Sequence, residues 1–228
     1  MIKILMYHNI NNFYTDRYVT TPASFEKQLK LIRALRYQTM TLSQICSMVI
    51  NRQPFPPTIV LTFDDGYLDN YQFALPLLLK YNMKATVFTV AGWVGRDTDW
   101  DDKRGRQFRQ MGWSELRDWV RHGMEVGSHT INHLNLPRIS AEETLRDEIF
   151  GSKQILEDGL QLPILSFGYP YGRFDDRVKE KVQQAGYLAA VSTLPGVAIK
   201  AASDVYALPR YEINPQLHIV KLAYRLVI

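Results

Sequence analysis

The sequence predicts an α/β fold in which parallel strands alternate with helices in a (β/α) barrel formed by one domain over residues 1–228. Short apolar, β-branched segments alternate with helical segments about seven times along the chain. The conspicuous polar motifs follow directly after expected strands, and (β/α) barrels build their active sites from those strand ends. A doubly wound sheet is less favoured because no glycine-rich phosphate loop follows the first expected strand.

The N-terminal half supplies three expected strands and three expected helices. Thr21 and Thr41 are well suited to cap two of the helices, since a hydroxyl at the N-cap accepts a hydrogen bond from the first turn. The third helix should cover residues 68–81 and direct Leu75, Leu78 and Leu79 toward the core. The expected strands cover residues 3–8, 58–63 and 84–90.

The C-terminal half continues the alternation. Ser114 is expected to cap a helix that runs to His122, and the run 140–143 resembles a capping box at the start of a long helix. Another helix should begin at Asp175 or Asp176. Further strands are expected at 163–167, 188–192 and 205–208, before a closing helix at 216–226. Residues 91–112 have no clear period and are long for a connection, which indicates a functional loop or a small lid.

Composition excludes several classes of function. The single cysteine, Cys46, excludes an internal disulfide and a cysteine-rich zinc site. The net charge is +4, but the basic residues are scattered among acidic ones, so we expect no nucleic-acid partner. Apolar runs are shorter than the ~18–20 residues of a membrane span, so no transmembrane segment is expected. No signal peptide is recognisable, which favours the cytoplasm and leaves an extracytoplasmic location open; nothing indicates the oligomeric state.

Two motifs at separate strand ends point to a metal centre. Asp64 and Asp65 end the expected strand 58–63, and the turn at Gly66 allows both carboxylates to face one cavity. His129 and His133 are four residues apart, so both imidazoles can face the same way on a helical turn. Two imidazoles and one carboxylate leave metal positions open for water and substrate, as catalytic sites require. Either aspartate could complete this set, and the other could act as a base.

Three segments in chain order resemble the first motifs of the polysaccharide deacetylases, the carbohydrate esterases of family four with a chitooligosaccharide deacetylase homology domain. These segments are residues 62–66, 128–133 and 167–172. The resemblance extends from about residue 59 to 210 and implies a distorted (β/α)7 barrel. It also implies that a divalent metal, zinc with nickel or cobalt as alternatives, is bound by Asp65, His129 and His133.

The same resemblance implies roles for the other site residues. Asp64 is similar to the catalytic base, and Tyr171 to the residue whose backbone N–H stabilises the oxyanion. The third motif lacks the family's arginine, and we hypothesise that Arg210 pairs with Asp64 instead; the fourth motif's Asp-Trp pair is not evident. His218 resembles the general acid of the last motif, but its place inside an expected amphipathic helix leaves a surface or core histidine as the alternative. His8 is the alternative proton donor, because Tyr7-His8 is similar to the opening of deacetylases that act on poly-N-acetylglucosamine.

Substrate contacts are expected from residues that follow the strands: Tyr169, Pro170 and Trp93, with Tyr171 and Trp113 as further aromatic candidates, although Trp113 could equally belong to the core. Together these features predict a hydrolase in which metal-bound water attacks an amide carbonyl and removes N-acetyl groups from N-acetylhexosamine units of a poly- or oligosaccharide. The alternatives are an O-acetyl esterase or a non-sugar amide hydrolase with the same metal site, and a non-catalytic carbohydrate-binding relative. A barrel nuclease would need more metal ligands and a basic groove.

Overall fold

A computed structural model describes residues 2–14, 16–98, 108–194 and 204–227. Its main sheet is parallel and follows the order β10-β1-β5-β6-β7-β8-β9, with β4 pairing beside β5. The sheet curves into a distorted (β/α)7 barrel, as predicted. Its strands are β1 (Ile2–Tyr7), β4 (Gln38–Thr39), β5 (Thr58–Phe63), β6 (Ala85–Thr89), β7 (Glu125–Ser128), β8 (Ser166–Gly168), β9 (Ala189–Val191) and β10 (Tyr211–Glu212). A separate parallel pair joins β2 (Asn9–Ile10) to β3 (Val19–Thr20).

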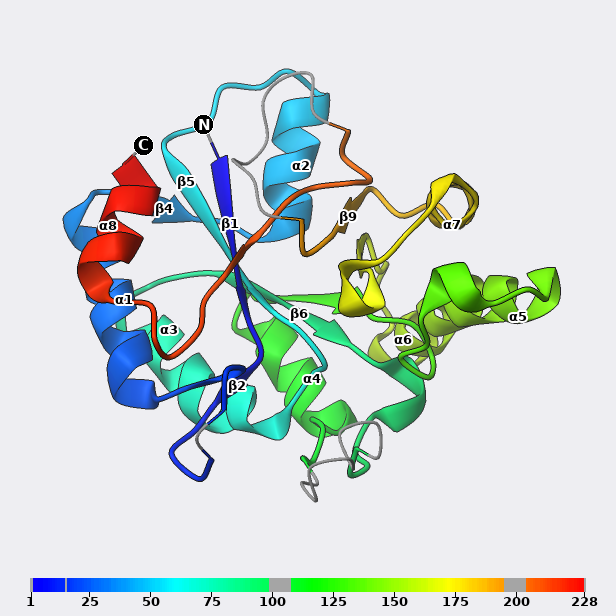
Figure 1. Cartoon of the computed structure of the whole chain (residues 1–228), viewed down its shortest axis with the longest axis horizontal. Coiled ribbons are helices and arrows are strands. Elements are labelled where there is room, and N and C mark those ends of the chain that lie inside the picture. The colour runs from blue at the N-terminus through cyan, green and yellow to red at the C-terminus, as the bar shows by residue number, and fades with distance from the viewer. Residues whose placement is uncertain (1, 15, 99–107, 195–203, 228) are drawn as a thin grey trace.

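Helices surround the strands on the outside of the barrel (Figure 1). Their buried residues are mainly apolar; α1, for example, buries Phe25, Leu29 and Ile32. None of the described helices is long and apolar enough to cross a membrane. The α-helices are α1 (Pro22–Ala34), α2 (Leu42–Ile50), α3 (Leu75–Lys80), α4 (Trp113–Arg121), α5 (Glu142–Arg146), α6 (Ser152–Leu160), α7 (Asp176–Gln184) and α8 (Ile219–Val227).

The barrel is closed by the segment 208–212. Leu208 bridges to Val191 at the end of β9, and β10 pairs with β1 on the other side. The C-terminal part of the chain therefore lies between the first and last strands, where the orange segment crosses β1 in Figure 1. This placement brings Arg210 inside the barrel, where the residue is 1% exposed.

Several predicted helix starts are confirmed. Thr21 accepts a hydrogen bond from the Ser24 N–H, and Asp175 accepts one from Val178 at the start of α7. Thr41 forms a capping box with Gln44. These caps depend on contacts within four residues, which is why the sequence is informative about them.

Two other predicted helix starts are wrong. Helix α4 begins at Trp113, and its first turn is capped by the Glu115 carboxylate, which accepts the Gly112 N–H at 3.0 Å. Ser114 is therefore inside the helix. Helix α5 begins after Ala141 without a side-chain cap, so the run 140–143 is not a capping box.

Two further predictions fail for reasons of helix phase and strand pairing. The helix expected at 68–81 contains a π-helical turn, Asn70–Ala74, before α3. This turn changes the phase of the following residues, so Leu75 and Leu78 are buried while Leu79 is 41% exposed. Residues 205–208 form a turn with a single bridge at Leu208, and the strand beside β1 is β10 instead.

The expected loop at 91–112 is described only at its two ends, since residues 99–107 lie outside the described part. The ends are tied together by a bridge between Asp97 and Arg109, and Gln110 bridges back to Tyr67. Whether the segment acts as a lid stays a prediction.

Candidate active site

A cavity of about 420 Å³ opens at the carboxyl ends of the barrel strands. Its lining includes His8, which follows β1, the Asp64-Asp65 pair, which follows β5, and His129, which follows β7. Parallel strands bring their carboxyl ends to one edge of a sheet, so residues distant in sequence meet here. The structure thus brings together the two predicted motifs. The rest of the lining is Met6, Asn9, Arg17, Tyr18, Tyr67, His133, Tyr171, Arg173, Thr193 and Glu212.

Asp65, His129 and His133 form a buried cluster whose potential ligand atoms all lie within 4.8 Å of one another. The Oδ1 atom of Asp65 is 3.5 Å from Nε2 of His129 and 3.3 Å from Nε2 of His133. Within the described part of the chain, this buried oxygen makes no hydrogen bond. A divalent cation could be coordinated by this carboxylate oxygen and the two imidazole nitrogens, which would satisfy the buried oxygen.

The protonation state of the histidines fits the same ligand role. Nδ1 of His129 lies 2.6 Å from the Gly168 carbonyl oxygen. In the tautomer with the proton on Nδ1, this nitrogen donates to the carbonyl, and the lone pair of Nε2 faces Asp65. Burial lowers the pKa of His129 from 6.5 to about 4, and it does the same for His133. Both imidazoles are therefore neutral near pH 7, as metal coordination requires.

Backbone strain is concentrated around this cluster. Asp65, Thr130, His133 and Tyr171 all have positive φ angles, of 71°, 66°, 56° and 58°. Non-glycine residues adopt this conformation at a cost of about 1–3 kcal/mol each, and such residues tend to gather at functional sites. The neighbouring Gly66 also has a positive φ, of 74°, and a Cβ there would lie 3.1 Å from Oγ1 of Thr89.

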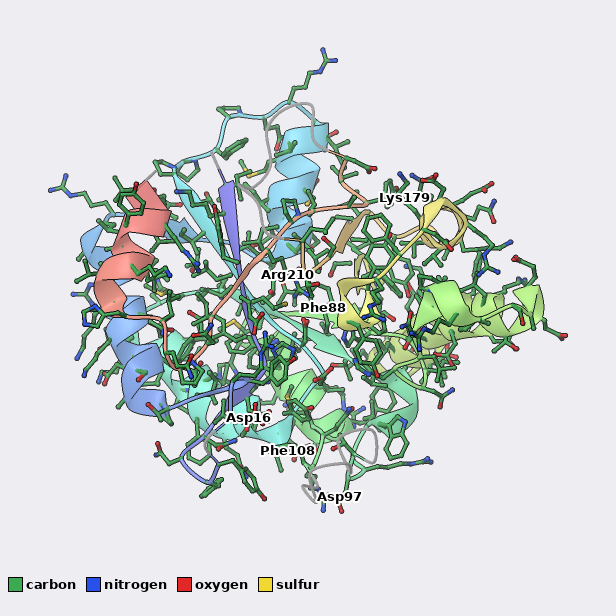
Figure 2. The ribbon with its side chains drawn as sticks, viewed as in Figure 1. Asp16, Phe88, Asp97, Phe108, Lys179 and Arg210 are labelled. Atoms are coloured by element: carbon green, nitrogen blue, oxygen red, sulfur yellow. The ribbon has the colours of Figure 1, made fainter. Side chains whose placement is uncertain are left out.

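The second carboxylate, Asp64, is held by Arg210. The two side chains form a bidentate pair with N···O distances of 2.7 and 2.8 Å, and both are almost fully buried. Burial alone would raise the pKa of Asp64, but the charge and hydrogen bonds of Arg210 outweigh it and hold the pKa well below its usual range. The guanidinium also lies over the ring of Phe88, at 5.7 Å, near the centre of the barrel (Figure 2). The hypothesised pairing is therefore present.

The two histidines considered as proton donors have different positions. His8 lines the cavity, with its ring 4.8 Å from that of Tyr18. His218 is exposed just before α8, where its Nδ1 accepts the Val220 N–H, and it does not line the cavity. The prediction that His218 belongs to the site is wrong, because the chain has already left the barrel interior at β10.

The predicted sugar contacts are only partly supported. Tyr169 is fully buried, stacks on Phe174 and donates its hydroxyl to the Tyr206 carbonyl, and Pro170 is buried beside it. These two predictions are wrong, because both residues are buried and neither lines the cavity. Trp93 is partly exposed but is not part of the cavity lining. Trp113 is half-buried and packs against Gly159, where a Cβ would lie 2.1 Å from its ring.

Aromatic side chains do line the cavity, but mostly different ones. Tyr171 is 53% exposed and its ring lies 4.7 Å from that of His133, so it is at the rim as predicted. Tyr18 and Tyr67 were not predicted. Tyr67 directly follows the Asp-Asp-Gly turn, which is a signal that could have identified it. Tyr18 precedes the short strand β3, and no periodic pattern in the sequence marks its orientation.

Comparisons with known proteins agree with this geometry. A family model described as polysaccharide deacetylase matches residues 51–190. YxkH of Bacillus subtilis (strain 168) is 30% identical over 215 residues, which cover 94% of this chain and 72% of the relative. The poly-beta-1,6-N-acetyl-D-glucosamine N-deacetylase of Staphylococcus aureus (strain MSSA476) is 24% identical over 209 residues, or 90% of this chain and 71% of that protein.

A solved structure has the same fold over its full length. The deacetylase PplD of Streptococcus pyogenes, in complex with acetate, superposes with a TM-score of 0.87 and 26% sequence identity. The superposition covers 99% of this chain and 97% of PplD. Because the family model covers more than half of the chain and the strand-end motifs converge on one cavity, the chain belongs to the polysaccharide deacetylase family.

Proposed function

We propose that this protein is a metal-dependent N-deacetylase that hydrolyses the acetamido groups of N-acetylhexosamine units in a carbohydrate. The observation that carries the proposal is the pairing of two different carboxylates in one cavity. Asp65 faces two neutral imidazoles, whereas Asp64 is held ionised by Arg210. The name of the Staphylococcus aureus relative supports an N-acetylglucosamine polymer as the substrate class.

Asp65, His129 and His133 would hold the metal, with zinc as the first candidate and nickel or cobalt as alternatives. When bound, such a cation supplies Lewis acidity, which polarises the acetamido carbonyl and makes water more acidic. The two imidazoles and one carboxylate leave room in the cavity for substrate. Their burial also keeps bulk water away, which strengthens electrostatic interactions in the site.

Asp64 would accept a proton from the attacking water. Arg210 keeps this carboxylate ionised and fixes its orientation through two hydrogen bonds, so it is available as a base at neutral pH. The new C–O bond forms as the carbonyl oxygen gains negative charge. The backbone N–H of Tyr171, at the cavity rim, would donate to that oxygen.

His8 would then protonate the departing nitrogen. It lines the same cavity and follows β1, so it approaches from a different strand than the base. Its proton allows the C–N bond to break with the nitrogen leaving as a neutral amine. The products are acetate and a free amino sugar.

The test is acetate release from N-acetylglucosamine oligomers, with and without a chelator, by the wild-type protein and by Asp64→Asn. We expect release that the chelator abolishes and that re-added zinc, nickel or cobalt restores. Loss of the base in Asp64→Asn should lower kcat by about 10²–10⁴-fold, the usual contribution of general base catalysis. Acetylated xylan is assayed in parallel. Release from xylan alone would replace the N-deacetylase by an O-acetyl esterase, and no release from either substrate would contradict the proposal.

A further inference from the structure

Glu148 is a buried carboxylate that contacts the loop between the two histidines of the cluster. It lies in the π-helical turn Asp147–Gly151, between α5 and α6, and is 3% exposed. Its Oε2 atom accepts the backbone N–H of Ile131 at 3.0 Å and that of Asn132 at 2.9 Å. Its Oε1 atom accepts Nδ2 of Asn132 at 2.6 Å. One side chain thus satisfies three donors of the loop.

The loop needs this support because its backbone is strained. Thr130 and His133 both have positive φ angles, and the N–H groups of the two residues between them donate to Glu148. On its other side, the loop is held by the turn after β6, where the Ala91 and Gly92 N–H groups donate to the carbonyls of residues 130 and 131. Removing either set of contacts leaves polar groups of the loop without their protein partners and lets the strained turn relax.

We propose that Glu148 is a positioning residue that sets the spacing of the His129 and His133 imidazoles and thereby raises the affinity of the site for a divalent metal. This inference rests on the proposed function, since it needs the cluster to bind metal. Glu148 does not line the cavity and acts only through the loop. Groups behind the direct ligands commonly contribute 10–100-fold to metal affinity by fixing ligand orientation.

A carboxylate is well matched to this position. Both of its oxygens accept hydrogen bonds, whereas a glutamine offers one accepting oxygen and turns two N–H donors toward the loop. The π-helical turn also fits the role, because such turns are frequent at functional sites, where they redirect a side chain from the regular helical pattern. Glu148→Ala removes all three contacts, and Glu148→Gln retains the size while removing part of the acceptance.

The test is metal affinity without substrate. Zn²⁺ binding is measured by competition with a chromophoric chelator, and the visible absorption of the Co²⁺-loaded protein reports the ligand geometry. The variants are Glu148→Ala and Glu148→Gln. Glu157→Gln is the matched control, because Glu157 in α6 also accepts a loop N–H, from Ile164 at 2.9 Å, but lies away from the cavity.

We expect Glu148→Ala to weaken Zn²⁺ binding by about 10–100-fold and to change the Co²⁺ spectrum, with a smaller loss in Glu148→Gln. Glu157→Gln should bind as the wild type does. Wild-type affinity in a folded Glu148→Ala would overturn the inference, as would an equal loss in Glu157→Gln. Should Glu148→Ala not fold, the same criteria apply to Glu148→Gln. A wild-type protein that binds no metal would instead reject the proposed function.

Discussion

A half-buried polar cluster around Glu125 and a buried one around Asp65 lie at the two ends of β7, and they are built in contrasting ways. At the amino end of β7, both oxygens of Glu125 are satisfied: Oε2 accepts the Thr86 hydroxyl and the Ser43 N–H, and Oε1 accepts the Ser166 hydroxyl, all at 2.8–3.0 Å. At the carboxyl end, Oδ1 of Asp65 faces two imidazoles without a hydrogen bond among the described residues.

The polar groups around Glu125 have a structural role, whereas those around Asp65 are arranged for chemistry. Glu125 and His129 are four residues apart, at the two ends of one strand. The Glu125 cluster has ordinary backbone angles, while the Asp65 cluster concentrates residues with positive φ. A satisfied network stabilises the barrel, whereas a strained and incomplete one is organised for a ligand. Mutations at the two ends should therefore change different properties.

Asp65→Asn should produce the largest effect on activity. The change keeps the side-chain shape but removes a charged metal ligand, so kcat/KM for acetate release should fall by about 10³-fold or more, as several kcal/mol of charge stabilisation are lost. The urea midpoint of the metal-free protein should stay the same or rise, because an unpaired buried carboxylate is removed. A lowered midpoint together with retained activity would contradict this prediction, because Asp65 would then have a structural role like that of Glu125.

His8→Gln and His218→Gln test which histidine donates a proton in the cavity at the carboxyl ends of the strands. If His8 donates the proton, its replacement should lower kcat by about 10²-fold or more with little change in KM. His218→Gln should behave as the wild type, since His218 is exposed outside the cavity. Steady-state kinetics on N-acetylglucosamine oligomers measure both variants. The opposite ranking would return the general acid role to His218.

In the metal-free protein, the two buried histidines should also determine how the free energy of unfolding depends on pH. Burial lowers the pKa of His129 and His133 to about 4 from 6.5, so the unfolded chain binds protons first as the pH falls. The histidines' contribution is fully present above pH 6.5, and the free energy of unfolding should decrease from there toward pH 4. Urea unfolding of the metal-free protein at several pH values measures the slope of the free energy of unfolding against pH. His133→Gln should reduce it, whereas a variant at Glu125 should leave it unchanged.

Glu125→Ala should have the smallest effect and a purely structural one. It leaves the hydroxyls of the buried residues Thr86 and Ser166 without their acceptor, so the free energy of unfolding should decrease by about 1–3 kcal/mol. In the fraction that stays folded, kcat and metal affinity should not change. Urea unfolding and metal titration on the same sample make the comparison. A lower kcat at unchanged stability would show that the two clusters are coupled through β7.

The sequence alone was sufficient for features that depend on neighbours along the chain. The alternation of β-branched and amphipathic segments predicted the barrel, and the caps at Thr21, Thr41 and Asp175 involve residues within four positions. The meeting of Asp64-Asp65 with His129 and His133 was also predictable, because parallel strands bring their carboxyl ends to one edge. The strand-end motifs were specific enough to indicate the family.

Tertiary structure decided the features that depend on direction and on distant partners. Arg210 reaches Asp64 only because the segment 208–212 closes the barrel between its first and last strands. Tyr169 and Leu79 face the opposite way from their expected directions, because a strand end or a π-helical turn changes which side chains face inward. Glu148 satisfies N–H groups 16 and 17 residues away. Local propensity carries no information on these contacts, since their free energy is gained only when the whole barrel is packed.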